Sequence, residues 1–380
     1  MAKVPPYETT TRLVARALGW TPAELVAGFR PAGVDDLAAV LAFRRLHLGP
    51  RVRWDDARYL PWRYRFGRPG AGFGELWVLH RDGALHGLVG TEQMTLARGD
   101  ERQSAQRLMD LLIEPRLADS GLGAWLNQTL FRQAPITLAV GANELSSGLV
   151  QRLFTPLPPM RSGLRAVRLQ PLLARAGHVG RLSGAAGRLA DPALAGWNAA
   201  ARWTARSAAL EIRPLARFED SDAPLPECRT IAPGRVALLR SGHYLNRRLF
   251  DHPRVRVAAL GLHHRGTRVG YVAWRLVEAR PGERELRIVD RAFMPEFEAR
   301  AWPAAFAATV HEATRQGCAS VRVLTQRAHD LEALRWQGLV VPAGSVPLPV
   351  GLHVADPAAA APWAEADWGL TEISDDGDEA

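Results

Sequence analysis

Apolar and polar residues alternate in short runs along much of the chain, as in β-strands that bury one face. In the first half this pattern predicts strands over residues 76–79, 85–96, 103–113 and 136–140. The segment His80-Arg81-Asp82-Gly83 follows the first of these strands, and its glycine suits a hairpin turn that needs a positive φ. Apolar residues at helical spacing predict helices over residues 35–47, 124–131 and 144–153. This mixture of strands and helices predicts an α/β (α+β) fold.

The second half of the chain carries the same kind of pattern in nearly the same order. It predicts strands over residues 236–239, 255–262, 269–277, 286–289 and 320–324, and helices over residues 303–316 and 330–336. Residues 171–210, between the halves, are rich in alanine, glycine and arginine and have no strand pattern. They predict a partly helical linker.

Three blocks of sequence return about 180 residues later. Tyr59-Leu60-Pro61-Trp62-Arg63-Tyr64 returns as Tyr244-Leu245-Asn246-Arg247-Arg248-Leu249, His80-Arg81-Asp82-Gly83 with Gly87-Leu88-Val89 as His264-Arg265-Gly266 with Gly270-Tyr271-Val272, and Arg107-Leu108-Met109-Asp110 with Pro115 as Arg287-Ile288-Val289-Asp290 with Pro295. The offset falls only from 185 to 183 to 180 residues, so the blocks keep their order and spacing. Solenoid units repeat every 20 to 50 residues or so. The repeat therefore indicates a duplicated domain.

The 380 residues are enough for two domains with separate cores. We expect five parts, namely an N-terminal segment at 1–26, a first domain at 27–170, a linker at 171–210, a second domain at 211–345 and an acidic C-terminal extension at 346–380. Residues 365–380 carry seven acidic side chains and no basic one. By composition alone that last stretch would be a disordered tail.

Charge and cysteine content narrow the classes of partner and site. The formal net charge is +9, but 47 of the 48 basic residues are arginines scattered along the sequence, with Lys3 as the one lysine. This scatter favours a solvated surface over a nucleic-acid interface, with an anionic ligand as the alternative. Two cysteines, Cys228 and Cys318, are too few for a disulfide framework or a metal site. No apolar run is long enough to span a bilayer, and a signal-peptide core is missing, so we expect a cytoplasmic protein.

The order of elements resembles the GNAT superfamily of acyl-coenzyme A transferases. The resemblance rests on Asp110-Leu111-Leu112-Ile113-Glu114-Pro115, which leads into Ser120-Gly121-Leu122-Gly123 and a helix. In that family the loop pattern is Arg/Gln-x-x-Gly-x-Gly/Ala, and its amides hold the coenzyme A pyrophosphate at a helix N-terminus. The resemblance covers residues 27–170 well and 211–340 more weakly. It implies two tandem GNAT-like domains with mixed, mostly antiparallel sheets.

The resemblance also implies a set of residues that bind acetyl-coenzyme A as co-substrate, and no metal. These are Leu112, Ile113, Arg116, Ser120, Gly121, Leu122, Gly123, Ala124 and Asn143. The chain departs from the family pattern at Ala118, where Arg or Gln is expected, and Asp119 adds a negative charge. Pro295 in the second copy is followed by residues 296–302 without any glycine. We therefore expect the first copy to hold the cofactor.

Candidate residues for proton transfer and acceptor binding come from polar and aromatic residues near the expected cleft. Glu92 and Glu114 are the available carboxylates for a general base, with a solvated face as the alternative. The aromatic residues Tyr59, Trp62 and Tyr244 could line an acceptor pocket, with packing between the domains as the alternative.

Two further groups have a structural explanation on the sequence alone. Asp110 recurs as Asp290 in the copy without a glycine loop, which favours a structural role for both. His263 and His264 flank a turn and have no third ligand at metal-site spacing.

The leading hypothesis is therefore acyl transfer from acyl-coenzyme A to an amine or hydroxyl, such as a sugar or cell-envelope precursor. Two features of the resemblance suggest that context, the Tyr-Leu-x-Trp-Arg-Tyr-like segment and Trp368-Gly369-Leu370-Thr371 near the C-terminus. One alternative is a catalytically degenerate GNAT-like protein that binds a ligand or partner. Another is aminoacyl-tRNA-dependent peptidyl transfer, as in the relatives that build cell-wall cross-bridges.

Overall fold

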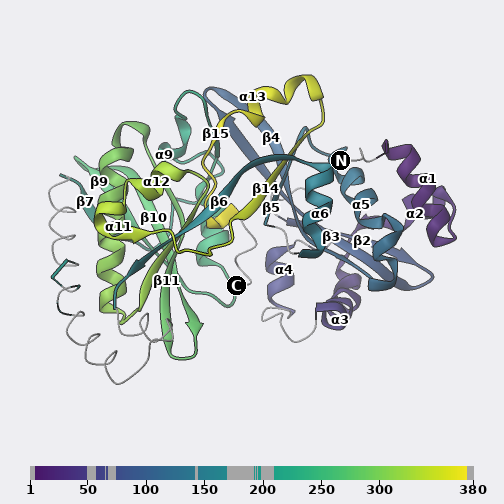
Figure 1. Ribbon diagram of the computed structural model, residues 1–380, viewed down its shortest axis with the longest axis horizontal. Helices are drawn as coiled ribbons and strands as arrows, with labels where there is room; N and C mark the ends of the chain where they lie inside the picture. The colour runs from purple at the N-terminus through teal and green to yellow at the C-terminus, as the bar shows by residue number, and fades with distance from the viewer. Residues whose placement is uncertain are drawn as a thin grey trace.

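The computed structural model describes residues 5–48, 57–64, 66, 74–141, 144–168, 192, 194, 196–197 and 209–374. Two α/β halves lie side by side, the first in purple and blue and the second in green (Figure 1). The expected cofactor residue Asn143 and most of the expected linker lie outside the described residues.

The first half confirms the predicted order of strands. Its strands are β1 (Phe29–Pro31), β2 (Gly74–Arg81), β3 (Ala84–Arg98), β4 (Glu101–Ile113) and β5 (Ile136–Val140). They pair antiparallel in this order, except that β4 and β5 run parallel. The helices are α3 (Leu37–Leu48), α4 (Tyr59–Arg63), α5 (Leu122–Phe131) and α6 (Glu144–Leu153), with a 3-10 turn, η3 (Pro115–Ser120), before α5.

The second half repeats this arrangement. Its strands are β7 (Glu211–Leu215), β9 (Val257–His264), β10 (Thr267–Arg280), β11 (Glu283–Phe293) and β12 (Ser320–Thr325), and only the β11–β12 pair among them is parallel. Its smaller elements are α9 (Pro226–Arg229), α10 (Gly242–Leu245), the π-helical turn η4 (Asn246–Phe250) and α12 (Ala328–Glu332).

The long helix of the second half, α11 (Pro295–Arg315), begins eight residues earlier than predicted. The sequence places its start at Pro303, because proline normally interrupts a helix. The structure instead has Pro295 in the first turn, where the missing N–H costs nothing. Pro303 lies inside the helix, between the buried residues Trp302 and Ala304. Burial of this face against the sheet offsets the lost hydrogen bond.

Two strands that the sequence did not predict join the halves. Strand β6 (Thr155–Ala166) leaves the first half and pairs with β12, while β14 (Leu348–Val354) returns from the second half and pairs with β5. The two strands also pair with each other. A short strand, β8 (Arg235–Leu238), pairs with the end of β3. The described strands thus form one connected sheet of 15 strands.

The N-terminal segment contributes to the core of the first half. Helices α1 (Tyr7–Leu18) and α2 (Pro22–Gly28) lie at the outer edge of the molecule in Figure 1. Val14 and Leu25 are buried in the same cluster as Trp125 of α5. Trp125 also donates a hydrogen bond from Nε1 to Oγ1 of Thr11 at 2.9 Å. None of the described helices is both long and apolar enough to cross a membrane.

The C-terminal segment docks on the fold as far as Ser374, as the resemblance implies and composition does not. Strand β15 (Asp367–Trp368) pairs with β8, and the 3-10 turn η7 (Glu372–Ser374) follows. Trp368 and Leu370 are each 1% exposed. Apolar burial at these two residues outweighs the acidic composition around them.

Candidate functional site

Strands β4 and β5 separate beside the turn that the resemblance singles out. They pair in parallel only from Ala105–Leu108 with Ile136–Ala139. Past this point β4 has a β-bulge. Its register against β3 shifts by one residue, and Asp110 has a φ of 52°. Leu112 and Ile113 still pair with β3 on their other edge. We call this gap between the strands the β4–β5 opening, and it leaves one edge of residues 109–113 without a β5 partner.

The turn after β4 forms a helix N-terminus with a left-handed glycine. Gly121 has φ 80° and ψ 4°, a conformation that a residue with a Cβ rarely adopts. Oγ of Ser120 accepts the N–H of Leu122 at 3.2 Å, so α5 begins at Leu122 and not at Ala124 as predicted. The next amides, of Gly123 and Ala124, lie in the first helical turn, where no intrahelical acceptor exists. An anion held at this helix N-terminus would accept hydrogen bonds from these two amides.

Gly123 also has a packing role. A Cβ at this position would lie 3.1 Å from Cδ1 of Ile113 and 3.4 Å from Cδ2 of Leu149. The glycine therefore lets α5 approach β4 and α6 closely. Its presence has a structural explanation that is independent of any cofactor.

The charged residues beside the turn pair with one another. Glu114 contacts Nδ1 of His86 at 3.1 Å and forms an ion pair with Nε of Arg116. Burial opposes ionisation of Glu114, but these hydrogen bonds outweigh it and lower the pKa of the carboxyl group. Arg116, the expected replacement for the missing loop cation, is 69% exposed in this pair. A lowered pKa and two partners leave Glu114 poorly suited to accept a proton.

Glu92 lies at the contact between the two halves. Its side chain is 2% exposed, and its Oε2 accepts Nη2 of Arg107 at 2.5 Å. The hydroxyl of Tyr244, from the second half, donates to its Oε1 at 3.0 Å. A carboxylate held in this way joins the halves, and proton transfer there would have to break a buried ion pair.

The two copies of the repeated aromatic segment meet at the same contact. Nε1 of Trp62 donates to the carbonyl of Arg247 at 3.1 Å, and Nη2 of Arg247 donates to the carbonyl of Trp62 at 2.5 Å. These two residues occupy equivalent positions in the repeat. Tyr59 is 1% exposed, while Tyr244 is half-buried. The structure thus brings Tyr59, Trp62 and Tyr244 to the contact between the halves, as the packing alternative expects.

Asp110 and Asp290 each bind a tyrosine hydroxyl and an arginine. Tyr64 donates to Asp110, with Arg44 at 3.5 Å, and Tyr271 donates to Asp290 at 2.6 Å, with Arg240 at 2.8 Å. Burial and the neighbouring Asp290 carboxylate raise the pKa of Tyr271 well above its usual value. The paired contacts agree with a structural role for both aspartates.

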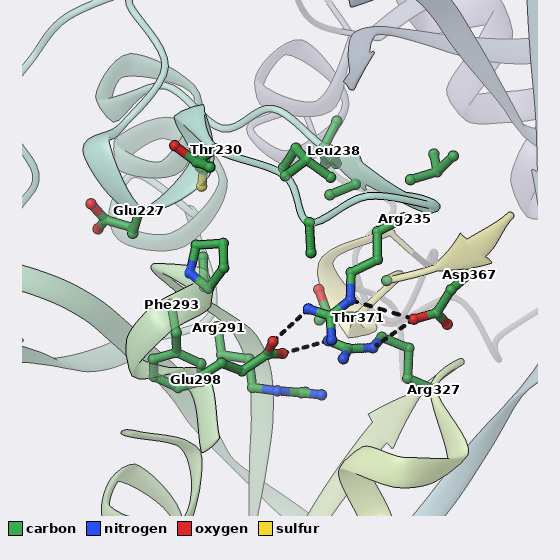
Figure 2. Close-up of a pocket in the computed structure, with 18 of the residues that line it drawn as sticks. Glu227, Thr230, Arg235, Leu238, Arg291, Phe293, Glu298, Arg327, Asp367 and Thr371 are labelled. Carbon is green, nitrogen blue, oxygen red and sulfur yellow. Dashed lines mark hydrogen bonds and ion pairs between the residues drawn. The ribbon is translucent and has the colours of Figure 1, made fainter. Parts of the chain in front are cut away.

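The second half has an equivalent opening, but different residues fill it. Strands β11 and β12 pair in parallel only from Glu285–Ile288 with Ser320–Val323, and α11 starts directly after β11. Figure 2 shows the pocket beside this β11–β12 opening. Glu298 of α11 accepts Nη1 of Arg235 and Nη1 of Arg327, each at 2.5 Å. The protein's own carboxylate therefore lies near the start of this helix.

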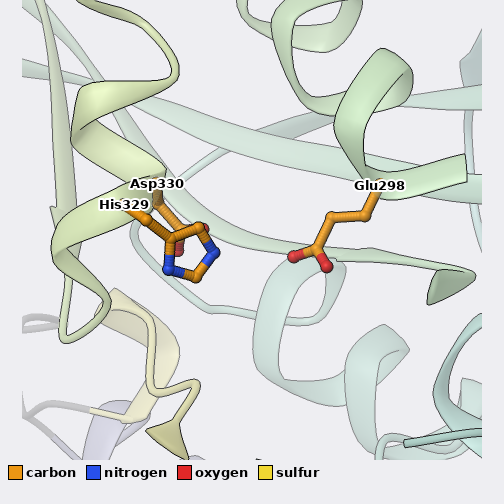
Figure 3. A group of neighbouring side chains, drawn as sticks. All are labelled: Glu298, His329 and Asp330. Carbon is orange, nitrogen blue, oxygen red and sulfur yellow. The ribbon is translucent and has the colours of Figure 1, made fainter. Parts of the chain in front are cut away.

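Glu298, His329 and Asp330 also lie close enough to suggest a metal site (Figure 3). Arg327 lies among them, with Nη1 at 2.5 Å from Glu298 and 3.6 Å from Asp330. Its guanidinium also contacts Nε2 of His329. A guanidinium in this position already neutralises the carboxylates and would repel a divalent cation. This cluster is better described as an ion-pair network.

Sequence reasoning missed the residues that line the pocket in the second half. Arg235, Arg327 and Asp367 come from three distant segments, and nothing in their local sequence marks them among the many arginines. Glu298 carried a usable signal, because it follows Pro295 at the position where a helix would begin.

Comparisons with known proteins identify the fold. No family model and no curated protein sequence matches the chain. Among solved structures, a GCN5-related N-acetyltransferase from Anabaena variabilis matches with a TM-score of 0.55 at 13% identity, over 89% of this chain and 75% of the other. Saccharomyces cerevisiae N-myristoyltransferase, solved with bound myristoyl-CoA, matches with a TM-score of 0.51 at 9% identity, over 86% of this chain and 83% of the other.

A third structure, from Enterococcus faecalis and described as a probable N-acyltransferase, matches with a TM-score of 0.50 at 8% identity. The match covers 90% of this chain and 81% of the Enterococcus faecalis chain. The chain therefore has a tandem GNAT fold, as the arrangement of its two halves indicates.

Proposed function

We propose that this protein transfers an acetyl or other acyl group from acyl-coenzyme A to an amine or hydroxyl group. The observation that carries the proposal is the β4–β5 opening together with the turn beside it. After β4, the chain passes through the Ser120-Gly121 turn and enters α5. The free edge of β4 offers main-chain groups to an extended pantetheine arm, and the start of α5 offers amides to phosphates. The fold shared with N-acetyltransferases and N-myristoyltransferase supports the same class of reaction.

In this reaction the acceptor nitrogen or oxygen attacks the thioester carbonyl carbon. A carbon–nitrogen or carbon–oxygen bond forms, the carbon–sulfur bond breaks, and the coenzyme A thiolate leaves and takes up a proton. The acceptor loses one proton to water or a base. Positioning of the thioester against the acceptor would supply most of the rate enhancement, with an oxyanion stabilised by main-chain N–H groups.

The acceptor in this proposal is an amine or hydroxyl on a sugar or cell-envelope precursor. The support is the resemblance carried by the repeated aromatic segment and by Trp368-Gly369-Leu370-Thr371.

Calorimetric titration with coenzyme A tests the cofactor directly. We expect saturable binding to the intact protein, and an absence of heat at millimolar ligand would remove the proposal. The sharpest variant is Ala124→Asp, which places a carboxylate in the first turn of α5. Aspartate there suits the helix dipole but repels pyrophosphate, so the fold should persist while binding falls at least tenfold. The control is Ala299→Asp, an exposed position of α11, which should leave coenzyme A binding unchanged.

A second candidate is a GNAT-like protein that binds its ligand without catalysis. The burial of Glu92 against Arg107 and Tyr244 favours it, because that carboxylate is engaged within the protein. Thiol release from acetyl-coenzyme A, measured with a panel of amino sugars and other amines, separates the two functions. Binding without thiol release for any acceptor would select the second candidate.

A further inference from the structure

A cavity of about 90 Å3 lies in the second half, next to the start of α11. We call it the α11 pocket. Its polar wall is formed by Arg235, Arg327, Glu298 and Asp367, and Val236 and Phe293 line its apolar side. Ligand pockets for larger molecules usually measure about 300 to 1,000 Å3. The cavity therefore suits a small ligand better than coenzyme A.

Two guanidinium groups in the pocket retain hydrogen-bonding capacity. Arg327 is 8% exposed, and its buried Nε makes no hydrogen bond to any described residue. Oδ2 of Asp367 lies 3.4 Å from this atom. Arg235 donates through Nη1 to Glu298, while its Nη2 has no hydrogen-bond partner in the part of the chain that the structure describes. Both side chains point into the space between Glu298 and Asp367 (Figure 2).

The charges around the pocket balance only when the exposed carboxylate of Asp367 is counted. Four arginines line it, Arg235, Arg240, Arg291 and Arg327. Three well-shielded carboxylates balance them in part, Asp290 against Arg240, Asp330 against Arg291, and Glu298 between Arg235 and Arg327. Glu227 also lines the pocket and is paired with Arg268.

The fourth carboxylate is Asp367, whose side chain is 47% exposed at the mouth. It lies 3.6 Å from Nε of Arg235 and 3.4 Å from Nε of Arg327, too far for strong hydrogen bonds. A mobile ligand carboxylate or phosphate could approach both guanidiniums more closely, because these groups match the planar donor geometry of arginine.

We propose that the α11 pocket binds a small ligand through a carboxylate or phosphate group, which takes the place of Asp367 between Arg235 and Arg327. This site is separate from the β4–β5 opening. Successive antiparallel pairs β5–β14, β14–β6 and β6–β12 reverse the strand direction between the halves. Strands β4 and β11 therefore run in opposite directions. Each opening lies at the C-terminal end of its strand, so the two openings face opposite ways along the strand direction.

The test uses calorimetry to measure the binding of inorganic phosphate, and separately of succinate, to the intact protein. We expect saturable binding of at least one of these anions. Arg235→Gln should weaken it at least tenfold, because Arg235 is the partly exposed member of the pair. Asp367→Asn should tighten it several-fold, because the competing carboxylate is removed. A preference for phosphate or for succinate identifies which oxyanion group the pocket takes.

The matched control is Arg217→Gln, which removes an arginine from an exposed pair with Asp251 elsewhere in the second half. It should bind the anion like the unaltered protein. Unfolding curves in urea establish that each variant is folded. The proposal is overturned if neither anion binds, if Asp367→Asn fails to tighten binding, or if Arg235→Gln binds normally. It is also overturned if Arg235→Gln weakens coenzyme A to the same extent, because the two sites would then be one.

Discussion

The two halves of the molecule open their sheets in the same way and fill the openings differently. In the first half, β4 leaves β5 after Leu108 and a left-handed Gly121 precedes α5. In the second, β11 leaves β12 after Ile288, and α11 starts at once with Pro295 and carries Glu298 to Arg235 and Arg327. The first opening offers donors to an external anion, while the second contains an internal one.

This difference shows how a duplicated domain can divide its tasks. Each half has a β-bulge beside the aspartate of its central strand, β4 or β11. Asp110 and Asp290 each hold a tyrosine and an arginine. Only the first half keeps glycine in the turn that follows. The second half instead gains the C-terminal segment, whose Thr371 donates to Asp290 at 2.6 Å.

The largest expected effect on stability comes from removing the side chain that holds the C-terminal segment on the fold. Trp368→Ala removes a side chain that is 1% exposed in a cluster with Leu96, Val236 and Leu370. We expect a loss of about 3–5 kcal/mol in the free energy of unfolding, measured in urea. The matched change Trp336→Ala, at a side chain that is 51% exposed, should cost less than about 1 kcal/mol. Equal losses would show that Trp368 does not anchor the C-terminal segment to the fold.

Next in size is the contrast between the two tyrosine–aspartate pairs. Tyr271→Phe leaves Asp290, which is fully buried, without one of its donors, and we expect a cost of about 1–3 kcal/mol in unfolding free energy. Tyr64→Phe should cost less, because the Asp110 side chain is 11% exposed and water can replace the lost donor. The reverse order would contradict the idea that the second opening is the more closed one.

Much of this architecture follows from local sequence, and the rest depends on tertiary contacts. Alternation and turn glycines such as Gly83 fix the hairpins, so β2, β3, β9 and β10 were predictable. Strand β6 was not, because Pro156, Pro158 and Pro159 argue against a strand that the structure places between β12 and β14. Which strand pairs with which is decided by the whole fold, and so is the exchange of β6 and β14.

The candidate site shows the same division. The turn at Ser120-Gly121 could be recognised from residue types, because glycine and a capping serine have local reasons to be there. The pairing of Glu92 with Tyr244 joins residues 152 positions apart, and no local pattern specifies it. The sequence therefore indicates an anion-binding turn, which depends on local residue types. It does not indicate which carboxylate can act as a base, because that depends on contacts between distant residues.

Lowering the pH should reduce the stability that the carboxylates at the second opening contribute to the fold. Burial opposes ionisation of Glu298, but the hydrogen bond from Arg235 and the nearby Arg327 outweigh it and lower its pKa. Asp330 behaves likewise through Arg291 and Arg327. Groups with lowered pKa values stabilise the fold fully above their unfolded values, near 4.5 and 3.8, and lose this effect as the pH falls further.

Glu298→Gln should therefore cost about 1.5 kcal/mol of unfolding free energy at neutral pH and reduce the loss of stability between pH 5 and about pH 3. Urea unfolding at several pH values measures both effects. An unchanged pH dependence would mean that Glu298 is not ionised in the ion-pair network.

The smallest expected effect sharpens the comparison at the proposed coenzyme A site. Asp119 is exposed in η3, just before Gly121, and places a negative charge where the pyrophosphate would lie. Asp119→Lys exchanges that charge for a positive one and should tighten coenzyme A binding by about fivefold, or about 1 kcal/mol for an exposed site. The gain should shrink at high salt, because exposed charges are screened. Glu296→Lys makes the same exchange in the first turn of α11 and should leave the affinity unchanged. If instead Glu296→Lys tightens binding and Asp119→Lys does not, the cofactor belongs to the second half.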